Sequence, residues 1–145
     1  MRILVTGSKG QLGREILALP GNGHEFAGVD LPEVDVADHQ QIAAVVAEVQ
    51  PDVVIHAAAN TNVDACELDP DLSWRNNALA TRNVALACRQ VDATLIYISM
   101  DFVFDRRKGA PYDEFDPPHP INVYGKTKLA GEYYATQIAP RFLIV

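Results

Sequence analysis

The chain has 145 residues, 48% hydrophobic and 21% charged, which is typical of one folded domain and not of a disordered chain. A net charge of −7 without a basic stripe argues against a nucleic-acid partner, and no apolar run approaches the roughly 20 residues of a membrane span. Two distant cysteines without metal-ligand spacing predict no metal site and favour a cytoplasmic protein.

The first part of the chain alternates short β-branched runs with stretches of helical periodicity. The strands expected here are residues 3–5, 26–29, 34–36 and 53–56, and the helices are 11–19 and 39–49. Pro20 and Pro51 follow the two helices, and Asp38 is placed to cap the second.

The second part continues the alternation and adds one long loop. We expect a helix over 71–91, a strand over 95–98, a loop over 105–120, a helix over 123–137 and a sixth strand over 142–145. Repeated strand–helix–strand units predict an α/β fold, a doubly wound parallel sheet of Rossmann type with helices on both faces. A chain that stops in a central strand indicates a truncated fragment of a longer protein.

A glycine-rich turn joins the first expected strand to the first expected helix, in the pattern Gly-x-x-Gly-x-x-Gly. Gly7 fits a tight turn, Gly10 lets the backbone approach a pyrophosphate, and Gly13 lets the helix pack closely on the strand. The helix N-terminus adds amide donors and partial positive charge. The turn therefore predicts that residues 1–145 form a domain that binds NAD or NADP.

Asp30 ends the second expected strand. A carboxylate there accepts hydrogen bonds from a ribose diol and repels a 2′-phosphate, which favours NAD. Lys9 and Arg14 lie close to the glycine turn in sequence and leave NADP open.

Tyr124 and Lys128 are four residues apart and share one face of an expected helix. An ammonium near a phenol favours the phenolate, so we expect Lys128 to lower the pKa of Tyr124. Tyr124 could then give a proton to a carbonyl oxygen whose carbon receives hydride from the nicotinamide.

These motifs resemble the extended short-chain dehydrogenase/reductase superfamily, and more specifically the dTDP-4-dehydrorhamnose reductases. The more specific resemblance is carried by residues 57–64, 101–105 and 120–128, and it extends over the whole chain. It implies NAD(P)H-dependent reduction of the keto group of a nucleotide-linked deoxysugar, with a nucleotide-sugar substrate and room for a homodimer.

The resemblance also implies which residues form the site. Tyr124 and Lys128 would be catalytic. The cofactor-binding residues would be Gly7, Gly10, Gln11, Leu12, Gly13, Asp30, Asp35, Val36, Ala57, Ala58, Ala59, Tyr124 and Lys128.

Two departures from the family pattern limit this reading. The family usually has a threonine where this chain has Met100, and a thioether cannot donate a hydrogen bond. Ser99 is adjacent, but successive strand residues point to opposite faces, so we do not expect it to substitute. The family's C-terminal substrate region would follow Val145, so we expect cofactor binding without full activity.

Two other functions stay open at this stage. The family resembles the regulatory subunit of methionine adenosyltransferase, a non-catalytic module, and Met100 favours such a role. A sugar-nucleotide epimerase is the third candidate.

Overall fold

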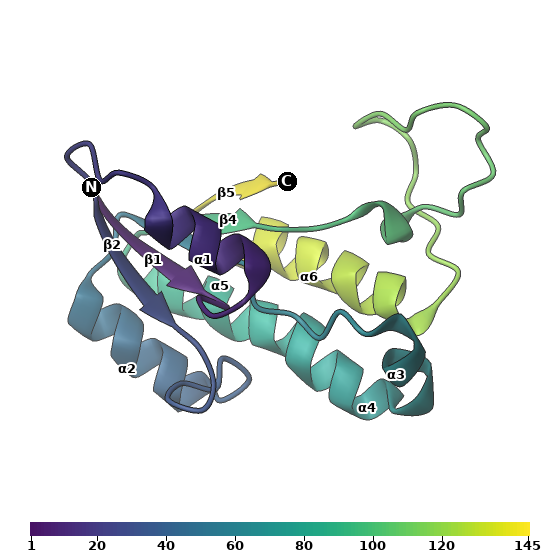
Figure 1. Ribbon diagram of the computed structural model, residues 1–145. Coiled ribbons are helices and arrows are strands. Elements are labelled where there is room, and N and C mark those ends of the chain that lie inside the picture. Colours follow the sequence, from purple (N-terminus) through teal and green to yellow (C-terminus); the bar gives the residue numbers. More distant parts are fainter.

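A five-stranded, all-parallel sheet forms the centre of the molecule in a computed structural model that describes residues 1–145. The strand order is β2-β1-β3-β4-β5, so the chain crosses over after β2 and then adds strands on the other side of β1 (Figure 1). The strands are β1 (Arg2–Thr6), β2 (Glu25–Val29), β3 (Val53–His56), β4 (Thr94–Tyr97) and β5 (Arg141–Ile144).

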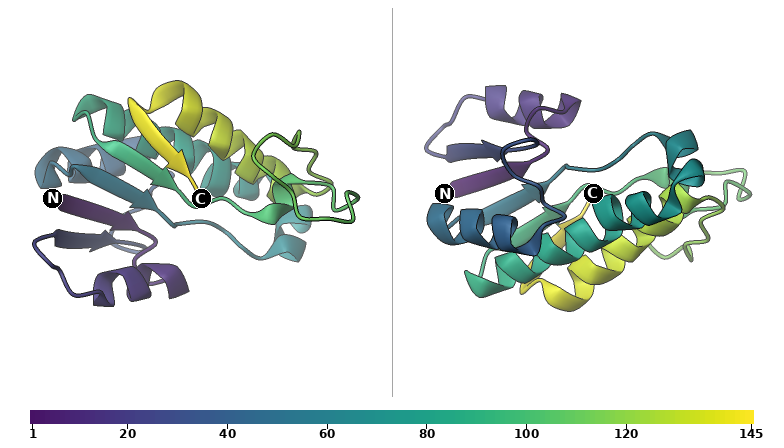
Figure 2. Two further views of the ribbon diagram at one scale, coloured as in Figure 1. Left: turned by 90° about the horizontal axis from the view of Figure 1, so that it is seen from above. Right: turned by 90° about the horizontal axis from the view of Figure 1, so that it is seen from below.

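Helices cover both faces of the sheet, but unequally. Helix α1 alone packs against β1 and β2 on one face, and α2, α5 and α6 lie side by side on the other (Figure 2). The helices are α1 (Gln11–Ala18), α2 (His39–Val49), α3 (Val63–Leu68), α4 (Pro70–Ser73), the π-helix η1 (Trp74–Leu79), α5 (Ala80–Gln90), the 3-10 helix η2 (Asp101–Val103) and α6 (Val123–Ile138). None of them is long and apolar enough to cross a membrane.

The core lies between the sheet and the α2–α5–α6 layer. Alternate residues of β3 and β4 point into this layer, which is why Val54, Leu95 and Tyr97 are fully buried while their neighbours in sequence are less so. Ile42 and Val46, one turn apart on α2, complete the packing.

The predicted fold class is confirmed, and most predicted elements agree with the structure to within one or two residues. The expected strand at residues 34–36 is wrong. Asp35 instead forms a turn, because its carboxylate accepts from the Ala37 amide (2.9 Å) and its carbonyl accepts from the Asp38 amide (2.9 Å). The last strand is therefore the fifth rather than the sixth.

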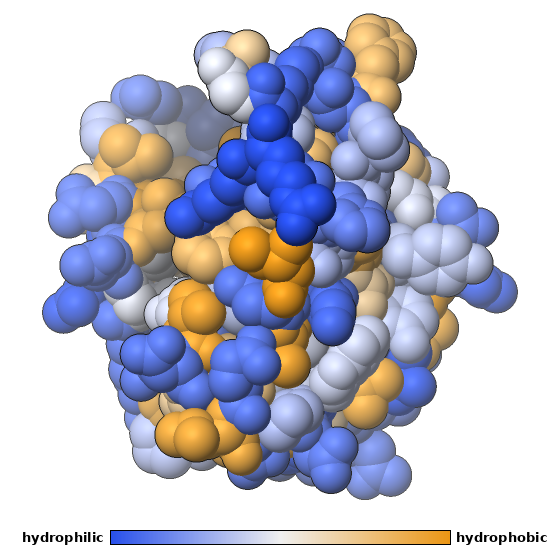
Figure 3. Space-filling model, turned by 90° about the vertical axis from the view of Figure 1, so that its right-hand side faces the viewer, coloured by the Kyte–Doolittle hydropathy of each residue, from blue (hydrophilic) through white to orange (hydrophobic).

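The predicted long loop is present between η2 and α6. Lys108 forms ion pairs with Asp113 and Asp116, and the rings of Phe104 and Tyr112 stack with their centroids 4.2 Å apart. Figure 3 shows the side of the molecule on which this loop lies, where strongly hydrophilic residues gather beside scattered apolar ones.

Candidate active site

The glycine turn has the geometry that its sequence predicts. Gly7 has φ +73°, a left-handed conformation, and a Cβ added there would lie 2.6 Å from the Ala58 amide nitrogen. A Cβ on Gly13 would lie 2.2 Å from the Gly7 carbonyl oxygen, so α1 can approach the turn only with glycine at this position. The turn after β1 is thereby held in direct contact with the segment after β3 on one side and with α1 on the other.

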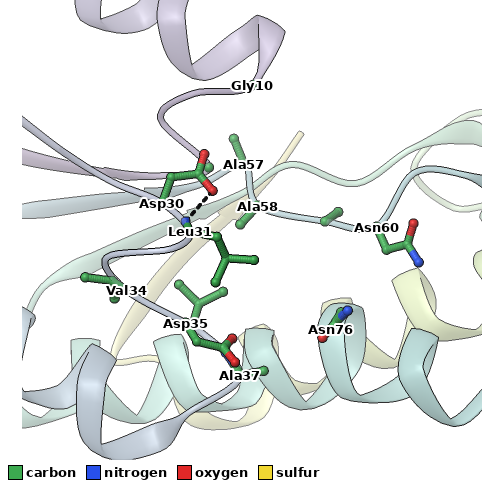
Figure 4. A pocket seen from close by; sticks show the side chains of 13 residues that line it. Gly10, Asp30, Leu31, Val34, Asp35, Ala37, Ala57, Ala58, Asn60 and Asn76 are labelled. Carbon is green, nitrogen blue, oxygen red and sulfur yellow. Dashed lines mark hydrogen bonds between the residues drawn. The ribbon is translucent and has the colours of Figure 1, made fainter.

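A pocket of about 370 Å³ opens beside this turn, within the size range of small-molecule sites (Figure 4). Its walls come from the glycine turn, the segment after β2, the segment after β3, and η1. The lining residues are Gly7, Gly10, Asp30, Leu31, Val34, Asp35, Val36, Ala37, Ala57, Ala58, Ala59, Asn60 and Asn76.

Most of the predicted cofactor residues line this pocket, and the others lie nearby or in a second region. Gln11 and Leu12 are exposed at the start of α1, outside the pocket, and Gly13 is buried beneath the turn. Tyr124 and Lys128 lie on α6, separate from the pocket lining.

The pocket also contains residues that the sequence did not single out: Leu31, Val34, Ala37, Asn60 and Asn76. Three of them, Leu31, Val34 and Ala37, belong to the loop after β2. The sequence wrongly predicts a strand over residues 34–36 in this loop. The sequence gives no clear signal for Asn76, because polar residues such as Arg75 and Arg82 also occur along the same helical stretch.

Asp30 is held by backbone donors at the edge of the pocket. Its carboxylate accepts from the Lys9 amide and from the Leu31 amide, each at 2.8 Å. The Lys9 ammonium lies 2.5 Å from Glu33 and donates to the Leu31 carbonyl at 2.8 Å. The Lys9 hydrogen bond lowers the pKa of Glu33, so Lys9 is tied to a charged carboxylate just outside the pocket.

The opposite wall of the pocket depends on the π-helix. Arg75 of η1 forms an ion pair with Asp35 at 2.5 Å, which fixes the loop after β2 against the helix layer. The wider π-turn then places Asn76 on the pocket and Asn77 in the interior.

Asn77 links the pocket to α6. Its side-chain oxygen accepts from the Asn60 amide (2.7 Å), and its side-chain nitrogen donates to the Asn60 carbonyl (3.1 Å) and to the Thr127 hydroxyl (3.1 Å). Thr127 in turn donates to the Tyr124 carbonyl at 2.7 Å. A pocket residue and the helix turn that carries Tyr124 are thus joined through one buried side chain.

A second buried chain of hydrogen bonds runs through His56 at the end of β3. Thr81 donates to the Asn77 carbonyl (2.6 Å), so the His56 Nε2–H donates to the Thr81 hydroxyl (3.1 Å) and Nδ1 accepts from Thr6 (2.6 Å). Burial lowers the pKa of His56 to about 3. His56 is therefore a neutral structural link between β1 and α5.

Tyr124 and Lys128 lie in the first two turns of α6, whose N-terminus is capped by Asn122 through the Gly125 amide (2.7 Å). The Lys128 ammonium donates to the Ile98 carbonyl (2.7 Å) and lies 4.1 Å from the centroid of the Tyr97 ring. Burial lowers the pKa of Lys128 to about 8.

The expected lowering of the pKa of Tyr124 is not found in the free protein. Burial raises the pKa of Tyr124, and Cys66 and Asp101 add to the increase. The reason is that the Lys128 ammonium is engaged by Ile98 and Tyr97 rather than by the phenol. Tyr124 is consequently a protonated phenol at neutral pH.

Ser99, next to Met100, bonds elsewhere. Its hydroxyl donates to the carboxylate of Glu132, which lies two turns along α6 from Tyr124, a rise of about 12 Å. The Ser99 hydroxyl is thus engaged by Glu132.

Comparisons with known proteins show which family the chain resembles. A family model described as RmlD substrate binding domain matches residues 1–145. The dTDP-4-dehydrorhamnose reductase of Aggregatibacter actinomycetemcomitans is 33% identical over 146 residues, which cover 99% of this chain and 50% of that protein. Methionine adenosyltransferase 2 subunit beta of Bos taurus is 37% identical over 139 residues, covering 90% of this chain and 41% of the relative.

Solved structures show the same architecture. A dTDP-4-dehydrorhamnose reductase from Bacillus anthracis in complex with NADP is 39% identical with a TM-score of 0.95, over 99% of this chain and 51% of that one. A UDP-glucose 4-epimerase from Thermus thermophilus in complex with NAD is 30% identical with a TM-score of 0.82, over 94% of this chain and 50% of that one. The chain spans about half the length of the relatives it matches.

Proposed function

The chain belongs to the RmlD substrate binding domain family, and from this premise we propose that it binds NAD(H) or NADP(H) in the pocket beside the glycine turn. The observation that carries the proposal is the cradle formed where Gly7 and Gly13 leave no room for a Cβ, at the N-terminus of α1. Relatives of this fold are solved with NADP and with NAD, which supports either dinucleotide.

The pocket residues divide into groups that suit the parts of a dinucleotide. Gly7 and Gly10 would hold the pyrophosphate, and Asp30 would accept from a ribose diol. Asp35, Val36 and the run Ala57–Ala59 would line the remaining walls, and Gln11, Leu12 and Gly13 would support the turn. Small side chains along the far wall leave the width that a flat ring system needs.

In the whole protein, we propose reduction of the keto group of a nucleotide-linked deoxysugar. The cofactor would supply the hydride. Tyr124, kept protonated by its raised pKa, would give the proton to the carbonyl oxygen. Lys128 uses one of its three donors on Ile98, and the other two would orient a ribose hydroxyl and the phenol. The Asn77 bridge would hold Tyr124 at a fixed distance from the pocket.

The whole-protein reaction rests on relatives about twice as long as this chain. The substrate would be a nucleotide sugar, whose pocket would be completed by a substrate region outside residues 1–145. Two free, buried cysteines support a cytoplasmic setting.

Titration with NADH and NADPH tests the binding proposal, with nicotinamide fluorescence as the signal. We expect saturable binding of at least one dinucleotide at micromolar concentration. Lys128→Met should weaken that binding about tenfold, because it removes a donor to the ribose, whereas Tyr124→Phe should leave it within about threefold. Equally weak, millimolar binding of both dinucleotides would contradict the proposal.

A non-catalytic regulatory role is the second candidate, and two observations favour it. Met100 has no hydroxyl at the position where the family usually has a threonine, and Ser99 is engaged by Glu132. The methionine adenosyltransferase subunit is also among the relatives. In a form as long as the reductase relatives, Met100→Thr should raise the turnover of a reductase at least tenfold. A regulatory protein would stay inactive and still bind dinucleotide.

A further inference from the structure

Lys128 is a buried cation without an ion pair. The residue is 4% exposed, and its ammonium donates to the Ile98 carbonyl and lies over the face of the Tyr97 ring. Burying an ammonium costs free energy unless opposite charge lies near it. A nearby opposite charge is therefore needed to favour the charged form of Lys128.

The titratable groups from the sheet and from the first turn of α6 do not supply that charge. His56 of β3 is neutral, because burial lowers its pKa to about 3. Tyr97 of β4 and Tyr124 of α6 are also neutral, because burial raises the pKa of both phenols.

The groups from η2 and α3 act elsewhere. Asp101 is exposed, forms an ion pair with Arg106 at 3.1 Å, and affects Tyr124 rather than the ammonium. Cys66 of α3 likewise acts on Tyr124. Glu132 of α6 is an anionic neighbour of the ammonium, and its charge raises the pKa of the lysine.

Glu132 lies one turn after Lys128 on the same face of α6 and is only partly exposed. The Ser99 hydroxyl donates to its carboxylate from the end of β4, one residue after the carbonyl that receives the Lys128 ammonium. A single short segment, residues 98–99, therefore binds both the Lys128 ammonium and the Glu132 carboxylate.

We propose that Glu132 is a positioning residue of the site: anchored by Ser99, its carboxylate is the counter-charge that holds the Lys128 ammonium in its charged state against the end of β4. The importance of a charged Lys128 rests on the proposed function, but the electrostatic interaction between Glu132 and Lys128 does not. Burial raises the pKa of Glu132, and the Ser99 hydrogen bond and the Lys128 charge oppose this rise. Each charge thus stabilises the other across one helical turn.

The test follows the Lys128 ε-carbon by NMR in protein labelled with ¹³C-lysine, without any dinucleotide. The chain has four lysines, and Lys128→Arg identifies the signal. In Glu132→Gln, which removes the charge but keeps an acceptor for Ser99, we expect Lys128 to titrate about one pH unit lower. Glu48→Gln, an exposed change on α2, is the matched control and should leave the titration unchanged.

An unchanged Lys128 titration in folded Glu132→Gln overturns the proposal. If that variant does not fold, the wild-type titration decides: the Lys128 signal should move a second time as Glu132 takes up its proton at acidic pH, and a single inflection overturns the proposal. Both titrations are measured without dinucleotide, so they test the role of Glu132 even if the protein does not bind the cofactor.

Discussion

The glycine turn and the start of α6 are two parts of one candidate site, and they are built in different ways. The turn depends on backbone: Gly7 and Gly13 are needed because neighbouring main-chain atoms occupy the space of a Cβ. The α6 region depends on side chains of the helix itself, of η1 and of the segment just after β4. We therefore expect a single substitution in the glycine turn to cause a large loss of dinucleotide binding. Single substitutions around α6 should cause smaller losses.

The largest expected effect is therefore in the turn. Gly13→Val would place a side chain against the Gly7 carbonyl and push α1 away from β1. We expect a loss of stability of about 3 kcal/mol and about 100-fold weaker NADH binding, measured by urea unfolding and fluorescence titration.

Gly23→Ala is the control for this change. Gly23 has a positive φ, +85°, and a Cβ there would meet no atom within 4 Å. It should cost about 1 kcal/mol of stability through backbone strain and leave NADH binding unchanged. Equal loss of binding in the two variants would show that the turn is not a specific cradle.

A smaller effect is expected where the two regions are joined. Asn77→Asp keeps the shape of the side chain but removes the two hydrogen bonds that its nitrogen donates to Asn60 and Thr127. Because the position is buried, we expect the free energy of unfolding to fall by about 2 kcal/mol. The neighbouring Asn76→Asp, at the partly exposed pocket wall, should change stability by less than about 0.5 kcal/mol. Equal losses in urea unfolding would mean that the bridge has no special role.

The same contrast explains what the sequence could predict. The order of strands and helices, the glycine turn and Asp30 follow from local periodicity and from residue types with few alternatives. Helix α2 and strand β3 coincide with their expected limits, because Asp38 caps one and Pro51 precedes the other.

What the sequence could not predict depends on tertiary contacts. The loop at residues 34–36 has the β-branched composition of a strand, but the Asp35 carboxylate binds its own backbone and Arg75, far away in sequence. The roles of Asn77 and Glu132 likewise require partners from other elements. The lower pKa that the sequence predicts for Tyr124 is wrong, because spacing alone does not reveal that the Lys128 ammonium donates to the Ile98 carbonyl.

The smallest effect is expected at the edge of the pocket, where the ion pair between Lys9 and Glu33 lies beside the glycine turn. Lys9 lies in the glycine turn, and its pairing with Glu33 would keep its ammonium from the 2′-phosphate of a bound NADPH next to Asp30.

Glu33→Gln would release Lys9, so we expect the ratio of NADPH to NADH affinity to rise about threefold, with NADH affinity itself unchanged. Glu25→Gln, an exposed change at the start of β2, is the control. Since Lys9 lowers the pKa of Glu33, the pair persists into mildly acidic solution and is lost only as the pH falls through that lowered value. The wild-type ratio should therefore approach that of the variant at low pH but not at neutral pH. If the variant and the wild type have the same ratio of NADPH to NADH affinity at neutral pH, Asp30 alone sets the preference between the two dinucleotides. The ion pair between Lys9 and Glu33 then contributes nothing to it.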